Sequence, residues 1–211
     1  DYLCEGSAGP GPHRIRINPY DPEKRIWLVN ETFHQIYVIA NDGSEVLATY
    51  GEKNVSGTDG THFGRPQDIA FMEDGRILIA DGLDNNRIMI MDSEMNYLGE
   101  FGSEGEGPGQ TKTIHSVAIG PDGRVFVLDR TGNRVNLWQA TDDPVEFEFI
   151  RSIGQLTLPL DIIVNENDFW ITDLGPLRFV NFDFDGNLKY TWLVPLALPD
   201  GYIEVHSFSV D

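Results

Sequence analysis

Short apolar segments separated by turns recur along the whole chain. Each unit has an apolar strand, a turn of the Asp-Gly type, a second apolar strand that ends in Asp or Asn, and a third strand after a short turn. The second and third strands of the four units lie in Ile26 to Ile39, Ile77 to Met91, Val125 to Trp138 and Phe169 to Phe182. No long segment has the 3.6-residue period of an amphipathic helix, so the pattern predicts an all-β fold.

An inner strand precedes each of these hairpins, and one more follows the last. We expect the inner strands to start near His13, Gln67, His115, Leu160 and His206, which are 54, 48, 45 and 46 residues apart. An outer strand is expected to complete each unit, at Glu45 to Gly51, Tyr97 to Gly102, Phe147 to Gly154 and Leu188 to Val194. Four-stranded units that repeat every ~40 to 50 residues are typical of a β-propeller, in which each unit is a blade.

The repeat accounts for four blades and one further strand. We expect residues 1–211 to form a single, incomplete propeller domain, because six blades of ~45 residues need about 270 residues. An open ring would expose a blade face and a sheet edge, which soluble proteins avoid. The expectation is therefore that the natural protein continues beyond this chain or that a protein partner completes the ring.

Three of the five histidines occupy the same position in the repeat. His13, His115 and His206 each begin an inner strand, while Gln67 and Leu160 hold this position in the intervening blades. Inner strands line the central channel, so in a six-bladed ring the three imidazoles would meet on the axis, about 120° apart. Three protein ligands with one open position are typical of catalytic zinc. The pattern predicts a zinc site, with a hydrogen-bonded core role as the alternative for any single histidine.

The units resemble NHL repeats, and four segments are similar to peptidyl-α-hydroxyglycine α-amidating lyase, also called peptidylamidoglycolate lyase. These segments are GTDGTHFGRPQDIAF, ADGLDNNRI, GPGQTKTIHSVAI and VLDRTGNRV. The resemblance implies a six-bladed propeller that holds zinc on His13, His115 and His206 and uses Arg130 as a catalytic residue. From the residues alone, pairing of Arg130 with a neighbouring acid is the alternative. The resemblance also implies a structural calcium ion that is bound by the main-chain oxygen of Ile15.

Two positions depart from the pattern of that family. The family's catalytic Tyr is replaced by Leu83, which cannot act as a base, and an Asp that helps to bind calcium is replaced by Ser207. We expect Gln67 and Leu83 to line a substrate pocket. The resemblance therefore supports zinc better than calcium, and calcium better than lyase activity.

Charge and composition exclude several other functions. Asp and Glu total 34 against 15 Lys and Arg, a net charge of −19 that would repel nucleic acid. The longest apolar stretches, such as Trp192 to Leu198, contain Pro and are far shorter than the ~20 residues that span a bilayer. The single Cys4 forms no internal disulfide, and a secreted chain without its signal would look the same. We expect an acidic extracellular or periplasmic protein.

The remaining motifs are interpreted as structural. Asp81, Asp129 and Asp173 recur at one repeat position as turn residues, His34 and His62 are structural or surface residues, and GSEGEGPG is a loop.

Two functions stay open. One is a zinc-dependent lyase that cleaves a carbinolamide C–N bond, and the three histidines favour this function. The other is a non-catalytic propeller that serves as an interaction or assembly platform, which Leu83 favours. A calcium-dependent, lactonase-like propeller would need several axial carboxylates or amides, and Gln67 alone falls short.

Overall fold

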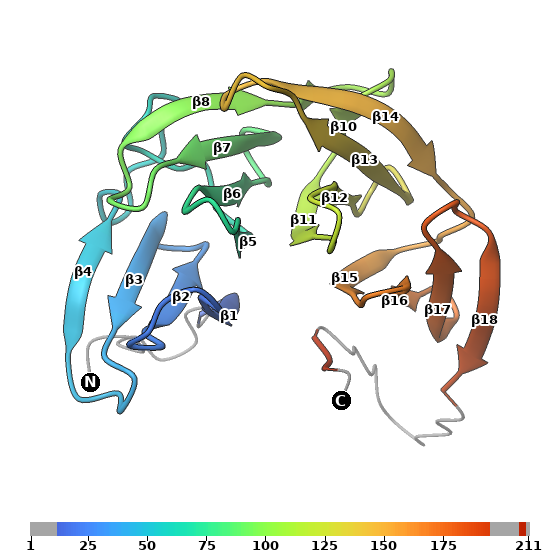
Figure 1. The fold of residues 1–211 in the computed structure, drawn as a ribbon, viewed down its shortest axis with the longest axis horizontal. Helices are drawn as coiled ribbons and strands as arrows, with labels where there is room; N and C mark the ends of the chain where they lie inside the picture. The colour runs from blue at the N-terminus through green and yellow to red at the C-terminus, as the bar shows by residue number, and fades with distance from the viewer. Residues whose placement is uncertain (1–11, 195–206, 210–211) are drawn as a thin grey trace.

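The computed structural model describes residues 12–194 and 207–209. They form four antiparallel four-stranded sheets, in which the strands follow one another in chain order, and one short two-stranded sheet (Figure 1). The described part of the chain contains no helix, and so no helix that could cross a membrane. The all-β prediction is confirmed.

Each four-stranded sheet is one blade. The first blade contains β1 (Arg14–Ile17), β2 (Ile26–Asn30), β3 (Gln35–Ile39) and β4 (Val46–Tyr50). The second contains β5 (Asp68–Phe71), β6 (Ile77–Asp81), β7 (Arg87–Met91) and β8 (Tyr97–Phe101). The third contains β11 (Ile114–Ile119), β12 (Val125–Asp129), β13 (Arg134–Ala140) and β14 (Phe147–Ile153). The fourth contains β15 (Pro159–Val164), β16 (Asp168–Leu174), β17 (Leu177–Asp183) and β18 (Leu188–Leu193). Between the second and third blades, β9 (Ser103–Glu104) pairs in parallel with β10 (Gln110–Thr111).

The four blades lie around a common axis, as expected for a propeller. The inner strands β1, β5, β11 and β15 face the axis, and the outer strands β4, β8, β14 and β18 lie on the periphery (Figure 1). The prediction of about four blades is confirmed. The start of the fifth inner strand, His206, lies outside the described residues, and residues 207–209 lie near the axis (Figure 1).

The core lies between the blades. The second strands β6 and β12 are buried on both faces, because each lies between two neighbouring blades. In β6, Ile77 and Ile79 pack with the first blade, whereas Leu78 and Ala80 pack with the third. The same alternation occurs in β12, whose Val125 and Val127 pack toward the second blade and whose Phe126 and Leu128 pack toward the fourth. All five residues of each strand are buried, which explains why the four residues before the final Asp are a continuous apolar run in the sequence.

The recurring acids at the ends of the second strands are structural, as expected. Each carboxylate accepts a main-chain hydrogen bond from the loop that enters its own blade and pairs with an Arg of the next strand. The main-chain bonds run from Gly64 N to Asp81 (2.6 Å), Lys112 N to Asp129 (2.9 Å) and Leu158 N to Asp173 (2.6 Å). The Arg partners are Arg87, Arg134 and Arg178. These contacts fix the start of the inner strands relative to the hairpins.

Candidate metal centre at the channel axis

Two of the histidines that were expected to share the axis lie against each other. His13 directly precedes β1 and His115 lies in β11, and their ring centroids are 4.9 Å apart with an interplanar angle of 77°. His206 lies outside the described residues, but Ser207, the next residue, lies 2.9 Å from the Arg14 guanidinium at the axis. The end of the channel at which His13 and His115 lie is called the histidine mouth below.

Main-chain carbonyl groups of the neighbouring blades hold both rings in the same way. His13 Nδ1 lies 2.7 Å from the Gln67 oxygen, and His115 Nδ1 lies 2.6 Å from the Leu160 oxygen. A carbonyl oxygen accepts only, so Nδ1 donates, and in the neutral form of the ring the lone pair is then on Nε2. This arrangement is the usual one for metal-binding histidines, because the second hydrogen bond fixes the tautomer and the ring orientation.

The described residues supply two of the three predicted zinc ligands. Within residues 12–194 and 207–209, no three His, Cys, Asp or Glu side chains are grouped so that they could hold a metal ion. A site with three protein ligands at the histidine mouth therefore needs a ligand from elsewhere, for which His206 is the predicted residue. The pair of oriented imidazoles fits zinc, whose protein ligands include neutral His nitrogen.

Gln67 lies beside this pair and links it to a charged group that the sequence analysis did not single out. The Gln67 side chain is fully buried, and its Nε2 donates to Glu31 Oε2 at 2.6 Å. Arg65, whose guanidinium lies 3.5 Å from the Glu31 carboxylate, completes the cluster. Glu31 follows Asn30 as Arg130 follows Asp129, so both charged residues occupy the same repeat position. That shared position is the signal that could have identified Glu31.

Leu83 lies in a turn that is pressed against the strand carrying His115. A Cβ added to the neighbouring Gly82 would lie 1.8 Å from the main-chain oxygen of Ile114. The Leu83 main-chain nitrogen donates to the Arg65 oxygen, at 3.5 Å. The turn therefore reaches both the Arg65 segment and the start of β11, the strand that carries His115, although the Leu83 side chain offers no proton-accepting atom.

Arg130 is half-buried and is held by its main chain rather than by an acid. Its main-chain nitrogen donates to the Thr113 oxygen at 2.8 Å. The adjacent Asp129 pairs with Arg134 instead, and Arg130 makes no ion pair with the described residues. No described carboxylate therefore neutralises the charge of the Arg130 guanidinium. A guanidinium without such a partner is able to bind a negatively charged atom of a substrate.

Buried charges that the sequence analysis did not anticipate lie deeper along the axis. Asp68 is fully buried, and Arg16 binds it through both Nε (3.0 Å) and Nη2 (2.8 Å). Ser116 Oγ also donates to Asp68, at 2.6 Å. Burial by itself would raise the pKa of Asp68, but the charges of Arg16 and Arg14 and these hydrogen bonds outweigh it and hold the pKa well below its usual value. Asp68 is therefore ionised at neutral pH.

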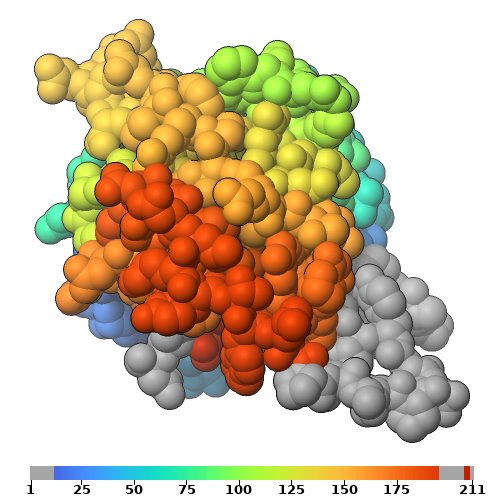
Figure 2. Space-filling view, turned by 90° about the vertical axis from the view of Figure 1, so that its right-hand side faces the viewer, coloured from blue at the N-terminus to red at the C-terminus, as the bar shows by residue number. Residues whose placement is uncertain are grey.

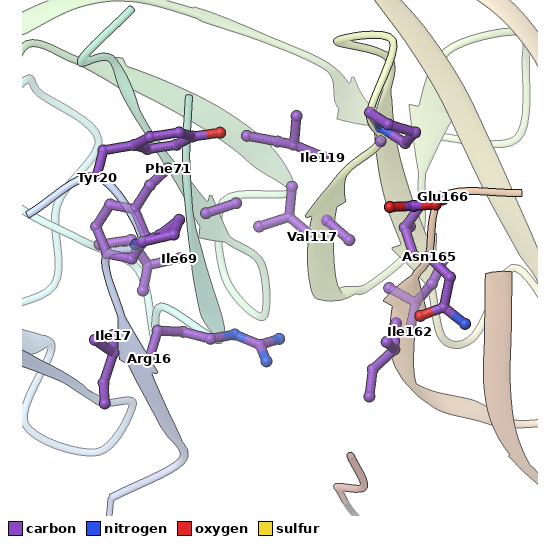
Figure 3. A pocket seen from close by; sticks show the side chains of 17 residues that line it. Arg16, Ile17, Tyr20, Ile69, Phe71, Val117, Ile119, Ile162, Asn165 and Glu166 are labelled. Carbon is purple, nitrogen blue, oxygen red and sulfur yellow. The ribbon is translucent and has the colours of Figure 1, made fainter. Parts of the chain in front are cut away.

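A cavity of about 790 Å³ lies at the opposite end of the inner strands. Its walls are mostly apolar and include Ile17, Phe71 and Ile119, while the Arg16 guanidinium and Glu166 extend into it from opposite sides (Figure 3). Its volume is in the usual range for small-molecule sites. The charged residues at the axis separate this cavity from the histidine mouth.

The comparisons with known proteins agree with the propeller fold. Residues 56–153 match the family described as "DUF5128: 6-bladed beta-propeller". The fold also resembles that of virginiamycin B lyase from Staphylococcus aureus, with a TM-score of 0.64, 16% identity, and coverage of 90% of this chain and 59% of that one. The fold defines the chain as a member of the β-propeller class, and the family model that matches residues 56–153 is that of a six-bladed propeller.

Within this class, the chain is similar in sequence to amidating lyases and to NHL-repeat proteins. It is 29% identical over 203 residues to a probable peptidyl-alpha-hydroxyglycine alpha-amidating lyase, pgal-1, of Caenorhabditis elegans, covering 95% of this chain and 52% of that protein. It is 30% identical over 135 residues to human NHL repeat-containing protein 3, covering 60% of this chain and 39% of that protein. The chain thus spans about half the length, or less, of these relatives.

Proposed function

We propose that this propeller binds one zinc ion at the histidine mouth through His13, His115 and His206, and that the site cleaves the C–N bond of a carbinolamide. The observation that carries the proposal is the pair of facing imidazoles, each with Nδ1 bonded to a main-chain carbonyl of the next blade. The similarity to a probable amidating lyase supports the substrate class.

The chain's own residues supply binding and charge stabilisation in this reaction. As the C–N bond breaks, the substrate hydroxyl becomes a carbonyl and a proton moves from its oxygen to the amide nitrogen. Zinc, when bound, supplies a Lewis acid for the hydroxyl oxygen. Arg130, which has no described carboxylate partner, stabilises negative charge that develops on the substrate. Gln67 keeps His13 oriented and fixes Glu31 at the mouth.

The zinc proposal is tested by removing one ligand. In protein purified without chelator, we expect a zinc-to-protein ratio near one, and His115→Ala should lower it to a small fraction, because two imidazoles seldom retain zinc through purification. Elemental analysis by mass spectrometry measures the ratio. His62→Ala is the matched control, since this surface histidine bonds Asp59 in a loop and its loss should leave zinc unchanged. Undiminished zinc in His115→Ala contradicts the assignment.

The alternative function, a non-catalytic interaction platform, is favoured by the surface of β18. Leu188, Tyr190, Trp192 and Leu193 are between 47% and 62% exposed on this outer strand of the fourth blade. Figure 2 shows the fourth blade from outside, without described residues covering it. An apolar strand of this kind is suited to packing against another sheet or a protein partner. Under this alternative, zinc would serve stability alone.

A further inference from the structure

Arg14 lies between two buried carboxylates at the channel axis. Its side chain is 2% exposed, and those of Asp68 and Asp161 are 0% exposed. Arg14 Nη1 lies 2.9 Å from Asp161 Oδ2, and Arg14 Nε lies 3.6 Å from Asp68 Oδ1. Asp68 begins β5 and Asp161 lies in β15, so the guanidinium of β1 joins the inner strands of the second and fourth blades.

Ser207 also contacts this guanidinium. Arg14 Nη1 donates to Ser207 Oγ at 2.9 Å, and Ser207 Oγ donates to Asp161 Oδ2 at 3.1 Å. The Phe208 main-chain nitrogen donates to the same carboxylate oxygen, at 3.3 Å. Residue 207 is the position at which the amidating-lyase pattern has an Asp that helps to bind calcium. The Arg14 guanidinium therefore lies where the side chain of that Asp would direct its oxygens.

The axial charges balance without an ion. Arg14 and Arg16 supply two positive charges, and Asp68 and Asp161 supply two negative ones, all within hydrogen-bond or ion-pair distance of one another. Two buried Asp without cationic partners would be strongly unfavourable, and either a metal ion or a basic side chain could neutralise them. Arg14 Nε and Nη2 make no hydrogen bond with the described residues, so charge is the main contribution of this side chain among them.

We propose that Arg14 replaces a divalent cation at the axis, so that this propeller closes its channel with a guanidinium and needs no calcium to fold. Calcium takes six to eight oxygen ligands at about 2.3–2.6 Å. The Asp68 and Asp161 oxygens are already bonded to guanidinium and hydroxyl groups, and a calcium ion beside them would be repelled by Arg14 and Arg16. A covalently attached cation cannot dissociate, so stability does not vary with free calcium.

The test is to compare melting temperatures with and without calcium, in buffers stripped of metals on a chelating resin and then supplemented with zinc. We expect the unmodified protein to melt at the same temperature with and without 2 mM calcium chloride, used at roughly the concentration that saturates weak extracellular sites. Arg14→Ala should melt roughly 10 °C lower without calcium, because it leaves buried carboxylates short of a partner. Calcium should restore much of this loss, by binding where the guanidinium was.

Arg178→Ala is the matched control. It removes an Arg from another buried Asp, Asp173, at a blade position away from the axis, so its loss of stability should not respond to calcium. An unmodified protein that gains stability with calcium, or that retains stoichiometric radioactive calcium in equilibrium dialysis, overturns the proposal. So does an Arg14→Ala protein that melts alike in both buffers. The dialysis result decides the matter even if Arg14→Ala does not fold, and it does not depend on lyase activity.

Discussion

At the position where the amidating-lyase pattern has Tyr, the proposed site has Leu83, whose side chain cannot accept a proton. We expect the zinc-loaded protein to cleave peptidyl-α-hydroxyglycine weakly or not at all, because a general base contributes about 10²- to 10⁴-fold in rate. Leu83→Tyr should raise the rate at least about tenfold, since its turn packs against the strand of His115. The measurement is a product assay for glyoxylate.

Leu83→Phe is the control for this experiment, because it adds the ring without the hydroxyl and should give no gain. Fast turnover by the unmodified protein would mean that another group takes the proton, and Glu31, bonded to Gln67, is the candidate that the structure offers. No gain from Leu83→Tyr with zinc bound would favour the interaction platform.

Asp68 makes the stability of the protein sensitive to acid. Its folded pKa lies below its ordinary value of 3.8, so its contribution to stability is complete above that value and is lost as the pH falls toward the folded pKa. The melting temperature of the unmodified protein should therefore fall steeply below about pH 4. Asp68→Asn should be less stable at neutral pH and lose less on acidification. Asp42→Asn, at an exposed site, should keep the steep fall, and a steep fall in Asp68→Asn would contradict the assignment.

The sequence predicted the positions of the axial histidines better than their surroundings. The repeat alone aligned His13 with His115, and they do meet. The residues that hold them could not be predicted, because Gln67 and Leu160 act through main-chain oxygens, which have no sequence signature. Asp68 was not singled out because it stands at the start of an apolar strand, where a lone acid is usually exposed.

At the scale of single elements, the turn between β6 and β7 depends on Gly82. A Cβ there would overlap a main-chain oxygen, which cannot move aside as a flexible side chain can. Gly82→Ala should lower the melting temperature by roughly 5 °C, because a forced shift of packed backbone costs about 1–3 kcal/mol. Calorimetry measures the change.

Gly154→Ala is the matched control for the Gly82 substitution. A Cβ at Gly154 meets no atom within 4 Å, and the residue does not have a positive φ. Its melting temperature should stay within about 1 °C of the unmodified protein. Equal losses of melting temperature in the two variants would show that the overlap with the Ile114 oxygen is not the cause of the loss in Gly82→Ala.

Strand positions were the easier part of the elements to predict. Runs such as Val125 to Leu128 contain only residues suited to a strand buried on both faces, and β12 consists of this run and the Asp129 that ends it. The short parallel pair of β9 and β10 was not predicted. GSEGEGPG, which contains β9, has no β-branched or aromatic residue to indicate a strand, and β10 is only two residues long, too short to show an alternating pattern.

At the scale of the whole molecule, the blade repeat explains why one sequence pattern specifies both the fold and the candidate site. Equivalent positions in successive blades meet around one axis, so a residue type that recurs in alternate blades is brought together without any local contact in the sequence. The partners of the charged residues at the axis follow no such repeat. Arg14 and Arg16 both come from β1, and their acids come from the second and fourth blades.

Alternate residues of β6 and β12 pack against different neighbouring blades, so a mutation at one of these positions affects the packing on one side of the blade only. Odd-numbered positions of β6 contact the first blade and even-numbered ones the third, so a substitution at Ile79 alters one junction and leaves the other intact. During evolution, substitutions at adjacent residues of one such strand can therefore occur independently of each other. Residues that pack together between two blades are instead expected to be substituted together, because they share the same core. In a set of related sequences, Leu78 should covary with positions in the third blade such as Val125, and Ile79 with positions in the first such as Val29.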